Sequence, residues 1–300
     1  GSEISPRCFW AIGDLFRQAG LPGGCLNVIY HRPSDAADIT RLLIEQPAVK
    51  KINFTGSTVV GRIIAETAGR NLKPVLMELG GKNNAIVRED ANLPHAAQQC
   101  QICMSTERIL VHESVVDAFK VELTKAVSMM FGDSATAQPL ALPASVSKVM
   151  HLGQDAVSKG AIVIHGQIPA SSSSTLSKTN GTFRPFVLGG VTEDMDIYHT
   201  ESFGPCVSLI TFGNDEEAIR IANDTEYGLS GAVFTKDLVK GLWVARRIET
   251  GAVHINSMTV HDEAGLPHGG VKNSGWGRFN ADAGLNEFLR TKTITFRAAE

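Results

Sequence analysis

The sequence predicts an α/β fold built on a partial, doubly wound parallel sheet. Apolar runs of strand length alternate along the chain with segments whose apolar residues recur at helical spacing. This alternation is typical of a parallel sheet covered by helices. The chain has 300 residues, 43% of them apolar and 20% charged, which is enough for one large or two ordinary domains with a sizeable core.

The N-terminal part predicts three helices and three strands. Residues 6–18 have helical spacing, with Ser5 as the N-cap and Pro6 in the first turn. The elements expected next, in chain order, are strand 26–30, helix 35–44, strand 49–54, a helix ending near residue 70 and strand 75–77.

The rest of the chain predicts a second, larger α/β region. Its elements are expected at strands 85–87 and 109–111, helices 115–129 and 145–159, strands 161–164, 186–188 and 207–210, helix 215–223, strand 231–235, helix 238–248 and strand 252–256. Residues 133–144 and the serine-rich run 171–175 are expected to be loops. Residues 290–296 alternate between polar and apolar side chains, a pattern typical of an edge strand that needs a partner.

Composition excludes several classes of partner. A formal net charge of −3 gives no basic surface for nucleic acid and no polybasic patch for a membrane. No apolar run reaches the roughly 20 residues that span a bilayer, and the first residues lack a signal-peptide pattern. Five cysteines at irregular spacing do not suggest a disulfide framework, so we expect a reducing compartment, the cytoplasm.

Cys103 is the candidate nucleophile. It follows a helix-like, alanine-rich segment and precedes the predicted buried strand 109–111, a junction that can expose a thiol while fixing its direction. Cys100 and Cys103 also form a C-x-x-C pair. A single pair without a second pair or a nearby histidine couple does not indicate zinc, and it does not open a helix in a small redox fold. We therefore expect no metal site.

The turn at Gly56 and Ser57 is a second candidate. Glycine lets a ligand approach the backbone, Ser57 or Thr58 can cap the following helix, and free amides at a helix start attract phosphate. The spacing fits neither of the common phosphate-binding glycine motifs. From the residues alone, this turn is equally well explained as a plain strand–helix connection.

Several motifs in one order along essentially the whole chain resemble the aldehyde dehydrogenase superfamily, NAD(P)-dependent enzymes that oxidise aldehydes to acids. The matching segments are 54–58, 78–82, 101–103, 201–205, Asn223 with 227–229, Pro267 with Gly269, Gly270 and Lys272, and 274–275 with 277–278. Residues 104–108 resemble branches that act on aromatic aldehydes such as salicylaldehyde or vanillin.

The resemblance implies a thiol mechanism. Cys103 would attack the aldehyde carbon to give a thiohemiacetal, and Glu78 would then activate water to hydrolyse the thioester. The residues implied in binding NAD or NADP are Gly56, Ser57 and Leu79, with Glu201 on the nicotinamide ribose and Phe203 beside the nicotinamide.

The chain also departs from the family pattern. Family members carry a further segment ahead of the Ser2–Glu3 motif, with the first strands of the cofactor sheet and an oxyanion-stabilising Asn. The stretch between Glu78 and Cys103 is about nine residues, or two and a half helical turns, shorter than in the family. We therefore expect a truncated dinucleotide-binding part over 1–80, a catalytic part over 81–283 and an oligomerisation strand over 284–300 of a homo-oligomer.

Two alternatives stay open. One is a catalytically impaired remnant of this family that acts as a binding or assembly module through its tail strand. The other is a cofactor-independent thiol esterase, which would need Cys103 and Glu78 but not the missing sheet. The aldehyde and the choice between NAD and NADP are not determined by the sequence.

Overall fold

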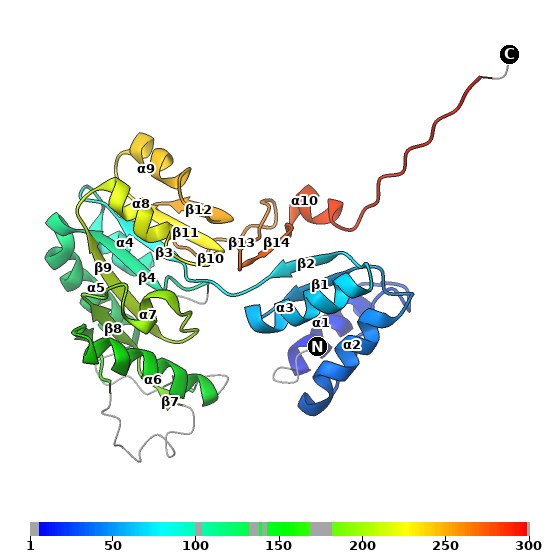
Figure 1. The fold of residues 1–300 in the computed structure, drawn as a ribbon, viewed down its shortest axis with the longest axis horizontal. Helices are drawn as coiled ribbons and strands as arrows, with labels where there is room; N and C mark the ends of the chain where they lie inside the picture. The colour runs from blue at the N-terminus through cyan, green and yellow to red at the C-terminus, as the bar shows by residue number, and fades with distance from the viewer. Residues whose placement is uncertain (1–5, 100–103, 132–137, 140–142, 169–181, 299–300) are drawn as a thin grey trace. The chain divides into compact units, whose positions relative to one another are not determined.

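The computed structural model describes residues 6–99, 104–131, 138–139, 143–168 and 182–298. The chain forms two compact units (Figure 1). The first unit comprises Gly1–Ile52 and Arg62–Val75, and the second comprises Asn53–Gly61 and Leu76–Glu300. The domain boundaries expected from the sequence, at residues 80 and 283, stay predictions.

The first unit is mainly helical. It contains α1 (Pro6–Gln18), the short helix η1 (Pro33–Asp35), α2 (Ala36–Glu45) and most of α3 (Thr58–Arg70), which confirms the three expected helices. The expected strand over 26–30 is wrong, because this segment is not part of any sheet among the described strands. It packs on α1 instead: a Cβ on Gly13 would lie 2.8 Å from Val28 Cγ2, and Tyr30 donates a hydrogen bond to the carbonyl of Pro6.

A seven-stranded sheet forms the centre of the second unit. Its strand order is β12 (Ala252–Ile255), β11 (Ser230–Phe234), β3 (Asn84–Val87), β4 (Arg108–His112), β9 (Cys206–Phe212), β8 (Phe186–Gly189) and β6 (Ile162–His165). Every neighbouring pair is parallel except β6 and β8, which are antiparallel. The predicted α/β class and all of these strands are confirmed.

Helices cover both faces of this sheet (Figure 1). They are α4 (Leu93–Gln99), α5 (Val116–Phe131), α6 (Pro143–Ser158), α7 (Asp196–His199), α8 (Asp215–Asn223) and α9 (Leu238–Ala245). Because strand side chains alternate between faces, Ile86 and Leu110 belong to a core with α6 to α9, whereas Ala85 and Ile109 belong to a core with α4 and α5. The four-residue helix α7 has no counterpart in the prediction.

Smaller elements complete the second unit. A three-stranded sheet has the order β1 (Ile52–Thr55), β2 (Val75–Glu78) and β14 (Gly275–Trp276). Two strand pairs are β5 (Gln138–Pro139) with β7 (Thr182–Phe183) and β10 (Tyr227–Gly228) with β13 (Val271–Lys272). The remaining helices are η2 (Glu113–Val115) and α10 (Ala281–Asn286). The expected loop over 133–144 thus contains a short strand at 138–139, because β7 supplies its partner. The serine-rich run 171–175 lies outside the described residues.

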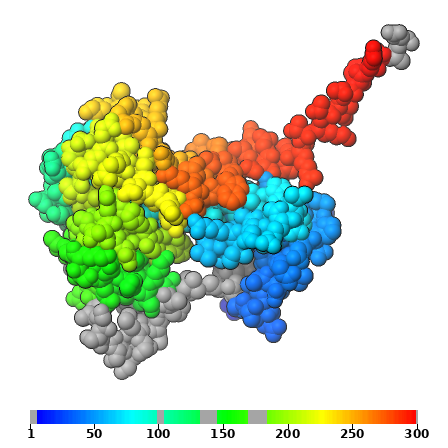
Figure 2. Space-filling model, in the orientation of Figure 1, coloured from blue at the N-terminus to red at the C-terminus, as the bar shows by residue number. Residues whose placement is uncertain are grey.

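The chain after α10 is exposed. Residues 289–298, part of the red segment in Figure 2, form no strand. Ile294 and Phe296 are 78% and 92% exposed. A strand needs a neighbouring backbone to satisfy its amides and carbonyls, and an apolar side chain needs a surface to cover it. The oligomerisation strand over 284–300 therefore stays a prediction. Across the described ranges, none of the helices combines the length and the apolar character needed to cross a membrane.

Candidate active site

The loop after β2 lies against the loop that contains Glu201. The Gly81 amide donates a 2.8 Å hydrogen bond to Glu201 Oε1. A Cβ on Gly80 would come within 2.7 Å of Glu201 Oε2, so only glycine lets the carboxylate lie this close to the backbone. Burial raises the pKa of Glu201, and the Gly81 hydrogen bond opposes that increase.

A buried ion pair joins the same two loops to the start of β4. Lys82 Nζ donates to Glu107 Oε2 at 2.6 Å, and the two side chains are 0% and 6% exposed. Glu107 also accepts hydrogen bonds of 2.8 to 3.0 Å from the Ser202 amide, the Ser202 hydroxyl and the Phe203 amide. One carboxylate with four donors therefore fixes the backbone next to Glu201, and such full pairing is what a buried charge requires.

Asn83 makes the third connection. Its side-chain amide donates to the carbonyl of Met104 at 3.0 Å, and Thr259 donates to the same carbonyl at 2.9 Å. Met104 directly follows Cys103 in the sequence. Cys103 and Cys100 themselves lie outside the described residues. The three segments 78–84, 104–108 and 201–204 are thus brought together by direct contacts.

Glu78 ends β2 on a well-anchored stretch of backbone. Its carbonyl accepts from the Gly56 amide at 3.1 Å, and it pairs with Gly275 of β14. The side chain is 17% exposed, and its Oε1 lies 3.8 Å from Nε2 of His268. Ser274 secures the next residues, since its carbonyl accepts from Leu79 N and its hydroxyl donates to Gly80 O.

The other candidate cofactor residues surround the start of α3. The Ser57 hydroxyl accepts from the Val60 amide at 3.4 Å, so Ser57 caps this helix as expected. A Cβ on Gly56 would come within 2.6 Å of the Phe54 ring. Leu79 is buried at 6% exposure, and Gly61 of α3 fits against its side chain because it has no Cβ.

Phe203 presents its ring to solvent from a strained backbone. The side chain is 71% exposed, and its φ of +50° is a conformation that bulky residues rarely adopt. The hydrogen bond that its backbone amide donates to Glu107 holds that conformation.

Cys206 lies three residues after Phe203 and is 7% exposed. Burial raises the pKa of its thiol to about 12, and the charge of Glu107 adds to the increase. A thiol so rarely ionised is not a nucleophile.

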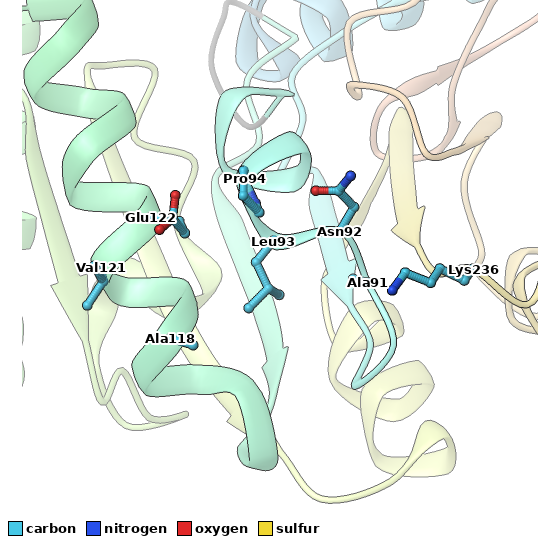
Figure 3. Close-up of a pocket in the computed structure, with 8 residues that line it drawn as sticks. All are labelled: Ala91, Asn92, Leu93, Pro94, Ala118, Val121, Glu122 and Lys236. Atoms are coloured by element: carbon cyan, nitrogen blue, oxygen red, sulfur yellow. The ribbon is translucent and has the colours of Figure 1, made fainter.

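The second unit also has a surface pocket of about 550 Å3 between α5 and the start of α4 (Figure 3). Leu93, Pro94 and Val121 give it an apolar wall, and Glu122 and Lys236 are its charged groups. None of the candidate residues described above lines this pocket. We therefore place the candidate site at the three joined segments and not at the pocket.

Comparison with known proteins identifies the family. A sequence model of the aldehyde dehydrogenase family matches residues 1–294. The chain belongs to the aldehyde dehydrogenase family. The resemblance inferred from its motifs is therefore confirmed over almost its full length.

Three aldehyde dehydrogenases illustrate this relationship. Vanillin dehydrogenase from Pseudomonas fluorescens is 43% identical over 312 aligned positions, which cover 99% of this chain and 62% of that protein. The crystal structure of a salicylaldehyde dehydrogenase from Pseudomonas putida G7 complexed with salicylaldehyde has a TM-score of 0.91 and 39% identity, covering 100% of this chain and 63% of that one. A succinic semialdehyde dehydrogenase from Streptococcus pyogenes in complex with NADP+ has a TM-score of 0.85 and 30% identity, covering 99% and 66%.

Two facts follow from these alignments. The chain spans about three-fifths of the length of the aldehyde dehydrogenases that it matches. In addition, the 312 positions aligned with vanillin dehydrogenase exceed the 300 residues of this chain by 12, so that relative has at least 12 internal positions without a counterpart here. The location of such a gap between Glu78 and Cys103 stays a prediction.

The sequence does not predict the contacts that assemble the site. It points to Glu78, Glu201 and Phe203 but gives no role to Lys82, Glu107 or His268. The one signal for a buried pair is that Lys82 and Glu107 have opposite charges and lie in two matching segments. Nothing in the sequence places His268 beside Glu78.

Proposed function

We propose that this chain carries the catalytic site of an NAD(P)-dependent aldehyde dehydrogenase that oxidises an aldehyde to the carboxylic acid. The observation that supports this most is the convergence of segments 78–84, 104–108 and 201–204 through the Gly81–Glu201, Lys82–Glu107 and Asn83–Met104 contacts. Membership of the aldehyde dehydrogenase family gives these contacts their chemical meaning.

In this proposal Cys103 is the nucleophile and Glu78 is the general base. The Cys103 thiolate attacks the aldehyde carbon and forms a thiohemiacetal, which becomes a thioester once hydride is lost. Glu78 then takes a proton from water, and the resulting hydroxide hydrolyses the thioester to release the acid and free Cys103. Glu78 suits that task because its carboxylate is mostly shielded from solvent and is carried by the anchored backbone at the end of β2.

The described residues fit a nicotinamide dinucleotide. When bound, NAD(P)+ supplies the acceptor for the hydride. Glu201 is half-buried with one oxygen committed to Gly81, which leaves its other oxygen to accept from ribose hydroxyls. The capped start of α3 offers amides to a phosphate, and the exposed Phe203 ring offers an apolar surface to the nicotinamide.

Gly80→Ala should weaken binding of NAD(P)H by about tenfold. The new methyl group would collide with the Glu201 carboxylate and displace its hydrogen bond, and bonds to charged groups contribute about 1.5–3 kcal/mol. Fluorescence titration with NADH and NADPH measures the change. Gly69→Ala in α3 is the matched control, because a Cβ there meets no atom within 4 Å. Equal loss in both variants would contradict the role given to Glu201.

Glu78→Gln should lower steady-state turnover by about 10²- to 10⁴-fold, the usual contribution of a general base. The amide cannot take a proton from water, so the thioester should accumulate while the first turnover stays fast. Rapid mixing with aldehyde and NAD(P)+ should therefore show a burst of NAD(P)H that equals the active-site concentration. Loss of the burst together with turnover would show that Glu78 acts before thioester hydrolysis.

Aromatic aldehydes are the proposed substrates, because the relatives at about 40% identity are named for vanillin and salicylaldehyde. The test is NAD(P)H formation by the purified 300-residue chain with vanillin, salicylaldehyde, benzaldehyde and succinic semialdehyde, each with NAD+ and NADP+. We expect turnover highest with the aromatic aldehydes. A folded chain that turns over none of these aldehydes would favour the binding-module alternative.

A further inference from the structure

His268 is an ionisable neighbour of Glu78 that the proposed mechanism does not use. Nε2 of His268 lies 3.8 Å from Oε1 of Glu78, and the side chains are 13% and 17% exposed. That separation exceeds a direct hydrogen bond but falls within ion-pair distance. At this degree of burial the attraction between opposite charges is screened less than at a free surface.

Both partners sit on fixed backbone. The amide of His268 donates to the carbonyl of Phe279 at 3.0 Å, and the amide of Phe279 donates back at 2.7 Å. Glu78 is held on the other side by its pairing with Gly275 and by Gly56. The two side chains therefore meet because the backbone brings them together, and either can change charge without unfolding its own element.

The charges around the imidazole favour its protonated form. The Glu78 carboxylate raises the pKa of His268 against the effect of burial, with Asp262 adding to the increase and Arg278 opposing it. His254 of β12 is a further titratable group nearby. Burial lowers the pKa of His254, and the charges of His261 and His268 lower it further.

We propose that His268 is a positioning residue that holds the Glu78 carboxylate as an ion pair and so orients it as the base that activates water. This inference rests on the proposed role of Glu78. An imidazolium at 3.8 Å attracts the carboxylate and so limits the directions that the Glu78 side chain can take.

The first test measures the pair without using catalysis. The imidazole of His268 is titrated by NMR in the 300-residue chain and in Glu78→Gln, with the resonance assigned from its absence in His268→Phe. We expect the pKa of His268 to lie above the ordinary value near 6.5 and to fall in Glu78→Gln. An unchanged His268 pKa in Glu78→Gln would overturn the ion pair, whatever the activity.

The second test measures the pH dependence of thioester hydrolysis. In the unmodified chain, kcat should decline as the pH rises through the pKa of His268, because the imidazole then loses the charge that holds Glu78. This decline should be absent in His268→Phe, which keeps a planar ring without a charge, and should move to higher pH in His268→Lys. His151→Gln is the control, since His151 is 74% exposed and faces Asp196. The same decline in His268→Phe as in the unmodified chain would overturn the proposal but leave the dehydrogenase function intact. Absence of turnover in the unmodified chain would overturn the function, while the NMR titration would still decide whether the ion pair forms.

Discussion

Cys103→Ala should abolish aldehyde-dependent formation of NAD(P)H, with a loss of at least about 10⁴-fold, because no other group on the proposed pathway can form the covalent intermediate. Binding of NADH should not change, since alanine removes only the sulfur. Initial rates with a saturating aromatic aldehyde, and fluorescence titration with NADH, measure the two quantities. Aldehyde oxidation that persists in Cys103→Ala would refute the assignment of the nucleophile.

Two other cysteines provide the controls for this substitution. Cys206→Ala should keep the activity, because its thiol is buried and its pKa of about 12 leaves almost no thiolate at neutral pH. Cys100→Ala separates a nucleophile at Cys103 from any need for the C-x-x-C pair. Alkylation with iodoacetamide followed by peptide mass spectrometry should label Cys103 before Cys206. The same Cys103→Ala variant with an activated ester and no cofactor tests the esterase alternative.

Glu107→Gln should reduce the free energy of unfolding by about 3–5 kcal/mol, the cost of removing one partner from a buried ion pair. The substitution leaves the ammonium of Lys82 buried without its counter-charge and weakens the acceptor of the Ser202 and Phe203 amides. Urea unfolding followed by circular dichroism measures the difference. Because Phe203 depends on this acceptor for its positive φ, the variant should also bind NAD(P)H less tightly.

A double substitution shows whether the charge itself causes this loss. Lys82→Met with Glu107→Gln removes both charges, so it should be less destabilising than the sum of the two single changes. Glu66→Gln is the surface control, because the Glu66–Arg70 pair is 65% and 77% exposed and should contribute less than about 0.5 kcal/mol. Additive single changes at Lys82 and Glu107 would mean that the two groups do not interact energetically in solution.

The sequence determined the fold class and most of its elements. The central strands of the large sheet are short apolar runs. Ile109 to Val111 are all buried, and burial on both faces of the sheet is what makes such a run recognisable. The segment 26–30 has similar composition, yet it packs on α1 and forms no strand. Composition indicates that a segment is able to form a strand, whereas strand pairing depends on a neighbouring strand that is often distant in sequence.

The same distinction separates the predicted from the unpredicted parts of the site. The motifs that contain Glu78, Glu201 and Phe203 predict these residues as members of the site. Lys82 and Glu107 are 25 residues apart in sequence. Glu78 and His268 are separated by most of the chain. Only the folded structure brings the members of each pair within 4 Å of each other. The sequence by itself determined which chemical groups this protein has and in what order. Only the tertiary structure decided which charges are buried together, because the stability of a buried charge depends on partners that folding alone supplies.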